Sequence, residues 1–98
     1  MFVLRRIEGL SMAPTYAPGQ VVLAWNKPAR IDTGDVVIIR HDGLEKIKRV
    51  QKVRGDELFV VGDNTELSTD SRHFGWIRRG DVLGKLWWPT RGHELQVS

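Results

Sequence analysis

A serine in a constrained turn is the first group in this sequence that could do chemistry. Ser11 lies in "GLSMAPT", between a glycine and a proline. Proline disfavours helical geometry in the residue before it, so the turn that presents Ser11 is expected to be stiff. A serine hydroxyl is a weak nucleophile until a base within hydrogen-bond distance removes its proton. The question is therefore which residue supplies the base.

A lysine can act as that base when burial favours its neutral amine. Lowering a lysine pKa from ~10.4 to about 7 or 8 corresponds to roughly 4 kcal/mol, at ~1.36 kcal/mol per pKa unit. A small domain can meet that cost once. We therefore expect at most one buried lysine, with a polar partner that holds its amine.

Histidine is the alternative base. His41, His73 or His93 could join Asp70 and the serine in a Ser-His-Asp arrangement. His41 lies in an expected turn, His73 follows the polar "TDSR", and His93 lies in the polar tail, so we expect all three at the surface. No two histidines have close ligand spacing, so we expect no metal site and no cofactor.

The elements that must position these groups are short β-branched runs separated by Gly, Pro and Asp. They cover residues 20–25, 35–41, 45–53, 57–63 and 81–88. This spacing predicts an all-β, mainly antiparallel fold. Asp42-Gly43 between two runs predicts a hairpin. No segment has helical periodicity over a full length, so any helix is a single turn near residues 11–16.

The run 45–53 carries the candidate lysines. Side chains alternate along a strand, so one face holds three lysines and a valine and the other holds an isoleucine, an arginine and a glutamine. In sequence order the two sets are Lys46, Lys48, Val50 and Lys52, and Ile47, Arg49 and Gln51. Either the lysine face is exposed to solvent and Ile47 points inward, or one lysine is buried among apolar side chains.

Bulk properties limit the remaining choices. The chain has 98 residues and no cysteine, which predicts a single domain over 1–98 and excludes disulfides and thiol catalysis. The net charge of +3 is spread over the chain, so we expect no nucleic-acid partner. No apolar run reaches the ~18 residues of a membrane span. We expect a cytoplasmic protein or one at the membrane periphery.

Three segments resemble the motifs of type I signal peptidases, in the same order along the chain. "SMAPTYAPGQVVLAW" resembles the motif around their nucleophile, "IKRVQKVRGD" their lysine motif, and "GDNTELSTDSRHFGWI" a third motif. The resemblance implies a signal-peptidase-like and LexA-like β-fold. It also implies a serine endopeptidase with a Ser/Lys dyad, whose substrate is a protein with an N-terminal leader or propeptide.

The same resemblance implies roles for individual residues. Ser11 matches the nucleophile, and its backbone N–H would form part of an oxyanion hole. Lys48 matches the general base, and Ser68 matches a serine that orients the lysine amine. Asp70 and Arg72 match a pair that braces the site.

Four further residues lie in or next to these motifs. Some family members have a serine where this chain has Gly9, and that serine adds to the oxyanion hole, so backbone donors would carry more of the stabilisation here. We expect Met12 either to line a substrate groove or to lie in the core. Pro14 is expected to stiffen the turn that presents Ser11 and to contribute to substrate binding. Gly62 is expected to adopt unusual backbone angles in a polar loop.

The chain also resembles a compact branch, the nickel-type superoxide dismutase maturation proteases, because only six residues separate Asp56 from Asp63. That resemblance implies propeptide removal. Two rivals stay open: a self-cleaving LexA-like domain and a non-catalytic β-rich peptide-binding module. Trp76, Trp87 and Trp88 either lie at a membrane interface or pack over a thin core. The sequence does not predict the oligomeric state.

Overall fold

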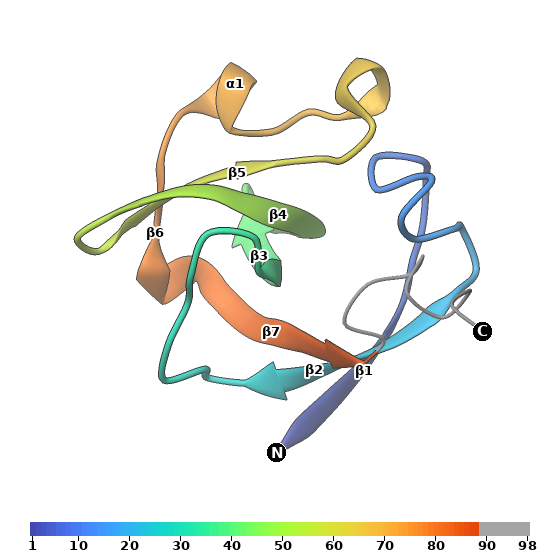
Figure 1. Cartoon of the computed structure of the whole chain (residues 1–98), viewed down its shortest axis with the longest axis horizontal. Helices are drawn as coiled ribbons and strands as arrows, with labels where there is room; N and C mark the ends of the chain where they lie inside the picture. Colours follow the sequence, from blue (N-terminus) through green and yellow to red (C-terminus); the bar gives the residue numbers. More distant parts are fainter. Residues whose placement is uncertain (89–98) are drawn as a thin grey trace.

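The computed structural model describes residues 1–88, and almost all of its regular structure is β-strand. One antiparallel sheet holds seven strands in the order β1-β2-β7-β3-β4-β5-β6 (Figure 1). The strands are β1 (Phe2–Arg6), β2 (Val21–Asn26), β3 (Val36–His41), β4 (Leu44–Arg54), β5 (Glu57–Val61), β6 (Ile77–Arg78) and β7 (Val82–Trp88). The predicted all-β antiparallel fold is confirmed.

The helical segments are short. They are α1 (Ser71–Phe74) and two 3₁₀ turns at Thr65–Leu67 and Arg79–Asp81. The single helical turn expected near residues 11–16 is wrong, because that segment forms a series of turns. None of the helices in the described residues is long and apolar enough to cross a membrane.

The β3–β4 hairpin has the predicted two-residue turn. His41 pairs with Leu44, and the intervening Asp42 and Gly43 have φ angles of 52° and 76°. Two positive φ angles define the type I′ turn, whose twist matches that of the strands on either side. The hairpin fixes the register of β4 and therefore the face on which each lysine lies.

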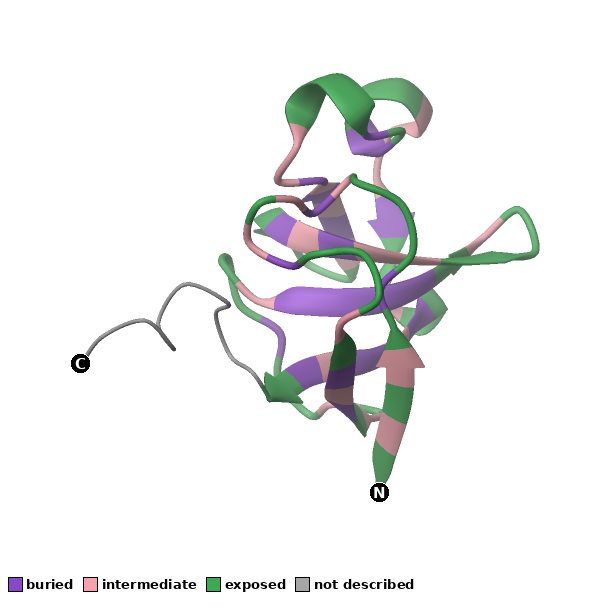
Figure 2. Ribbon diagram, turned by 90° about the vertical axis from the view of Figure 1, so that its right-hand side faces the viewer, coloured by how far each residue is buried: buried purple, intermediate pink, exposed green. Residues whose placement is uncertain are grey.

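Strand β3 is buried on both faces. Its residues 36–39 alternate between two apolar clusters, and Figure 2 shows buried residues concentrated in the middle of the molecule. The first cluster contains Ile7, Met12, Tyr16, Val22, Ala24, Val36, Ile38 and Leu86. The second contains Ile31, Val37, Ile39, Val50, Leu58, Val60, Ile77 and Val82. A strand buried on both faces appears in sequence as a continuous apolar run, as "VVII" does here.

Candidate active site

The loop that carries Ser11 is closed at its base and anchored inside. The Ile7 N–H donates to the Gln20 carbonyl at 2.7 Å, and the Gly19 N–H donates to the Ile7 carbonyl at 2.8 Å. Met12 and Tyr16 from the same loop are fully buried in the first apolar cluster. Two backbone bonds and two buried anchors hold the half-buried Ser11 in one position.

A second loop binds the backbone beside Ser11. The Asn64 N–H donates to the Ser11 carbonyl at 2.7 Å. In Figure 1 the blue segment that contains Ser11 approaches the yellow segment after β5 on the right of the molecule. The first and third sequence motifs, about 50 residues apart, are thus joined through the backbone at Ser11.

Lys48 on β4 is buried, with 4% of its surface exposed. Its Nζ donates to the Ser68 hydroxyl at 2.8 Å. Burial lowers the pKa of Lys48, and the nearby cations Lys46 and Arg72 add to this, while Asp70 opposes it.

No other lysine or arginine in residues 1–88 is buried, so the expectation of one buried lysine with a polar partner is confirmed. The interpretation in which all lysines of this face lie in solvent is wrong for Lys48.

The Ser68 hydroxyl connects the lysine to a buried carboxylate. It donates to Asp70 Oδ2 at 2.8 Å while it accepts from Lys48. Asp70 is fully buried and also accepts from the Gly62 N–H at 2.8 Å. Burial alone would raise the pKa of Asp70, but its bonds with Arg72, Gly62 and Ser68 outweigh burial and hold that pKa well below its usual range. Asp70 is therefore a fixed anion at neutral pH.

Arg72 forms an ion pair with Asp70, as the sequence resemblance implied. Its Nε donates to Asp70 Oδ1 at 2.9 Å, its Nη2 donates to Oδ2, and its backbone N–H donates to Oδ1 at 3.1 Å. Asp70 is also the N-cap of α1, where His73 Nδ1 accepts from the Asp70 N–H at 3.4 Å. The same carboxylate thus ends a loop, starts a helix and positions Ser68.

Glycine is needed at position 62 for a different reason from the one expected. Its φ angle is not positive, so unusual backbone geometry is not the reason for glycine here. A Cβ at this position would lie 2.7 Å from the Ser11 carbonyl oxygen and closer still to the Ser68 side chain. Glycine is required because the backbone passes between these two residues without room for a side chain.

Ser11 and Lys48 both line a cleft of about 480 Å³. It is lined by Arg5, Arg6, Ile7, Glu8, Gly9, Leu10, Ser11, Met12, Glu45, Lys46, Ile47, Lys48, Leu67 and Thr69. One wall comes from the end of β1 and the loop after it, and the other comes from the first half of β4. The nucleophile candidate and the base candidate therefore face the same space from different elements.

Three residues near Ser11 bear on the expected substrate groove. Met12 borders the cleft but is only 1% exposed and lies in the first apolar cluster, so it is a core residue. Pro14 is exposed, follows a cis peptide bond and does not line the cleft. Gly9 lines the cleft with φ 74°, where a serine would be strained although it has space.

No histidine among residues 1–88 lines this cleft. His41 stacks on Phe74 with ring centroids 4.0 Å apart. His73 caps α1, and 59% of its side chain is exposed. His93 lies outside the described residues. The arrangement in residues 1–88 therefore does not support a Ser-His-Asp triad.

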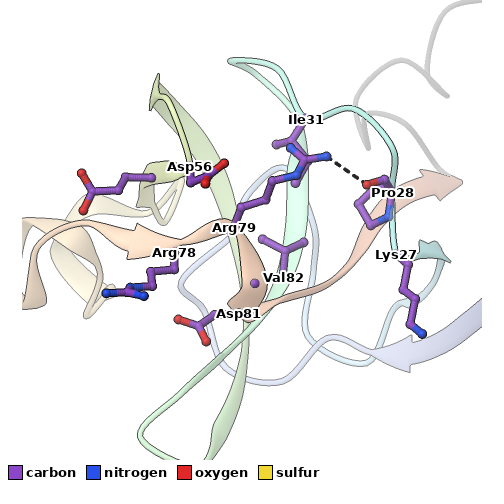
Figure 3. A pocket seen from close by; sticks show the side chains of 10 residues that line it. Lys27, Pro28, Ile31, Asp56, Arg78, Arg79, Asp81 and Val82 are labelled. Carbon is purple, nitrogen blue, oxygen red and sulfur yellow. Dashed lines mark hydrogen bonds between the residues drawn. The ribbon is translucent and has the colours of Figure 1, made fainter.

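A larger and more open hollow of about 930 Å³ lies elsewhere on the surface (Figure 3). Arg79 bridges part of it by donating to the carbonyls of Pro28 and Ala29 at 3.0 and 2.8 Å. The hollow contains none of Ser11, Lys48 and Ser68.

Comparison with known families covers the second and third motifs. Residues 41–90 match the family described as signal peptidase, peptidase S26. The chain belongs to this family. The matched segment includes Lys48, Ser68 and Asp70, whereas Ser11 lies before it.

Two curated signal peptidases are similar over part of their length. A signal peptidase I from Bacillus caldolyticus is 36% identical over 56 residues, which is 54% of this chain and 31% of that protein. Signal peptidase I V from Bacillus subtilis (strain 168) is 44% identical over 43 residues, which is 44% of this chain and 26% of that protein. The matches thus span about a third or less of each relative.

Sequence reasoning missed two supports of the site. Strand β1 was not predicted, although "FVLRRI" alternates weakly, and it supplies one wall of the cleft. Arg49 and Asp63 form a bidentate ion pair at 2.8 and 2.9 Å that ties β4 to the loop after β5. Both residues lie in the recognised motifs, in "IKR" and "GDN", but no local pattern indicates that they pair.

Proposed function

We propose that this chain is a serine endopeptidase that uses a Ser11/Lys48 dyad to remove an N-terminal leader or propeptide from a protein substrate. The observation that carries the proposal is the burial of Lys48 against Ser68 in the cleft that Ser11 lines. Membership of the signal peptidase family supports the substrate class.

The proton positions around Ser68 make Lys48 available as a base. Ser68 has one hydroxyl proton, which it donates to the Asp70 carboxylate, so toward Lys48 its oxygen can only accept. A neutral Lys48 amine satisfies Ser68 with one N–H. Its lone pair is then free to accept the proton of Ser11.

The reaction would proceed in two steps. Ser11 Oγ attacks the substrate carbonyl while Lys48 takes its proton, and Lys48 then protonates the amine that leaves when the C–N bond breaks. A water molecule then attacks the acyl ester and gives a proton to Lys48, which passes it to Ser11 Oγ as the ester bond breaks and the acid product leaves. The Ser11 N–H would stabilise the oxyanion in both steps.

An open strand edge beside the dyad would bind the substrate chain. Val50 exchanges backbone bonds with Gly34 and Asp35 on the β3 side, so the odd-numbered residues of β4 point their backbone groups the other way. β5 covers that edge only from Arg49 onward. The backbone groups of Glu45 and Ile47 therefore face the cleft, where an extended peptide would add as a strand.

Two narrower features follow from the sequence resemblance and the surface. The compact-branch resemblance points to the propeptide of nickel superoxide dismutase as the substrate. Phe2 packs on Trp25 and Trp87 with ring centroids 4.8 and 5.0 Å apart, and these side chains are about half exposed. We propose a peripheral membrane contact for this cluster. Trp76 is separate from it and contacts Phe59 and Arg54.

Mass spectrometry of candidate leader peptides incubated with the protein tests the activity. We expect one cut in the wild type and none in Ser11→Ala or Lys48→Met. Lys52→Met is the matched control, because Lys52 is an exposed lysine on the same strand. Cleavage that survives Ser11→Ala would end the dyad proposal.

The same experiment separates the rivals. Fragments of the chain itself would favour a self-cleaving LexA-like domain. Peptide binding by the wild type without any cut would favour a non-catalytic module.

A further inference from the structure

An ion pair bridges the two walls of the cleft. Arg5 on β1 donates from Nε to Glu45 Oε1 at 2.6 Å and from Nη2 to Oε2 at 3.1 Å. The sheet order places three strands between β1 and β4, so only the curvature of the sheet brings these two side chains together. The pair therefore crosses an open space at the end of the cleft.

The position of the pair relative to the dyad follows from the strands. Glu45 and Ile47 lie on the same face of β4, and Arg5 is the last residue but one of β1. Glu45 precedes Lys48 by three residues, which is about 10 Å at ~3.3 Å per residue. An extended substrate bound along β4 would thus reach the ion pair about three residues from the bond that is cut.

The side chains at this end of the cleft carry more positive than negative charge. Arg40 on β3 also approaches Glu45, with 3.8 Å between Arg40 Nη2 and Glu45 Oε2, so two guanidinium groups share one carboxylate. Arg6 and Lys46 line the adjacent cleft, and Glu8 is the one further acid in its lining. Another carboxylate would be attracted here, and an added cation would be repelled.

We propose that Arg5, Arg40 and Glu45 form a specificity subsite that takes an acidic side chain of the substrate, about three residues from the cleaved bond. This inference rests on the proposed peptidase function. It narrows the substrate to leaders with an aspartate or glutamate at that position. Arg5 would contact this side chain directly, and Glu45 would limit the strength of the contact.

Peptides with Glu, Gln or Lys at each position near the cut would test the subsite through kcat/KM. We expect Glu to exceed Gln about fivefold at one position, as for a single partly exposed ion pair, and Lys to fall below Gln. The preference for Glu should weaken as salt is added, because partly exposed charges are screened.

Variants of the two partners distinguish selection from a structural role. Arg5→Gln should reduce the preference for Glu to about one, whereas Glu45→Gln should increase it, although both changes break the same ion pair. Arg54→Gln is the matched control, because Arg54 pairs with Glu57 at the far end of β4 and lies outside the cleft. Equal cleavage of Glu and Gln peptides at every position, or the same change in both variants, would overturn the subsite.

Binding of the same peptides to Ser11→Ala, measured by fluorescence anisotropy, separates this inference from the proposed function. If the wild type cuts no peptide but Ser11→Ala prefers the Glu peptides, the subsite holds and the peptidase proposal fails. If the wild type cuts peptides but neither assay shows a preference for Glu, the subsite is refuted and the peptidase proposal holds.

Discussion

Strand β3 and the cluster around Asp70 are both buried, but different forces hold them. Residues 36–39 of β3 are four consecutive apolar side chains in two apolar clusters. The other region contains all four buried polar or charged residues of the described chain, Lys48, Ser68, Asp70 and Ser71. Apolar packing is non-directional, whereas each polar group in the second region needs a particular partner at a particular distance.

This difference assigns stability to one region and fixed geometry to the other. Full burial of an apolar side chain such as that of Ile38 contributes about 1.5 to 3 kcal/mol. Burial of an ion costs several kcal/mol unless partners offset it. The apolar clusters therefore offset the cost of holding Lys48 out of water, and the bonds among Lys48, Ser68 and Asp70 decide where its amine lies.

The largest expected effect separates activity from stability. Ser11→Ala and Lys48→Met should each lower kcat/KM at least about a thousandfold, as expected for the loss of a nucleophile or its base. Ser11→Ala should keep its free energy of unfolding, and Lys48→Met should gain about 1 kcal/mol because a buried amine is removed. Cleavage assays and urea denaturation measure the two quantities. A strongly destabilised Lys48→Met would mean that Lys48 supports the fold.

The next effect concerns the anion in the polar cluster. Asp70→Asn should lower the free energy of unfolding by about 1 to 3 kcal/mol, because an amide cannot accept at both of the buried oxygens that bind Ser68, Gly62 and Arg72. The folded pKa of Asp70 lies below the unfolded value of ~3.9, so its contribution is complete above that pH and is lost as the pH falls through the folded value.

The stability gap between wild type and Asp70→Asn should therefore shrink in acid. Denaturation curves at several pH values test this. A gap that does not change with pH would contradict the role of the charge.

A core substitution should lower stability without a change in the pH profile. Ile38→Ala removes a buried side chain from the first cluster and should cost about 2 to 4 kcal/mol. At a temperature where the variant remains folded, the pH dependence of kcat/KM should match that of the wild type. A shifted profile would show that the apolar clusters and the site are not separable.

The smallest effect concerns the turn before Ser11. Gly9→Ser should lower the free energy of unfolding by about 1 to 2 kcal/mol, because φ is 74° at this position. Thermal denaturation measures it, with Gly80→Ser as a control at a glycine whose φ is not positive. Equal stability of the two variants would remove backbone strain as the reason for glycine at position 9.

The sequence predicted the apolar region better than the polar one. Five of the seven strands and the hairpin at Asp42-Gly43 follow from local patterns, because "VVII" and Asp-Gly carry their own structural preferences. β6 has two residues, too few for a pattern. β1 is paired on one side only, and its exposed Phe2 and Leu4 obscure the alternation.

The sequence indicated which residues belong to the candidate site, but not the contacts between them. Burial of a single lysine follows from its free-energy cost, and the motifs indicated Ser68 and Asp70. The contacts made by Gly62 depend on two loops that meet only in the folded chain. The Arg5–Glu45 pair joins residues 40 positions apart through sheet curvature, which no local pattern encodes.

The most direct test of the dyad is the pH dependence of kcat/KM for a leader peptide that the wild type cuts. Only neutral Lys48 can accept the Ser11 proton, and burial lowers its pKa. Activity should therefore rise with pH along a single ascending limb whose midpoint lies below the ~10.4 of a lysine in water. A rate that does not depend on pH across this range, or a limb that persists in Lys48→Met, would contradict Lys48 as the base.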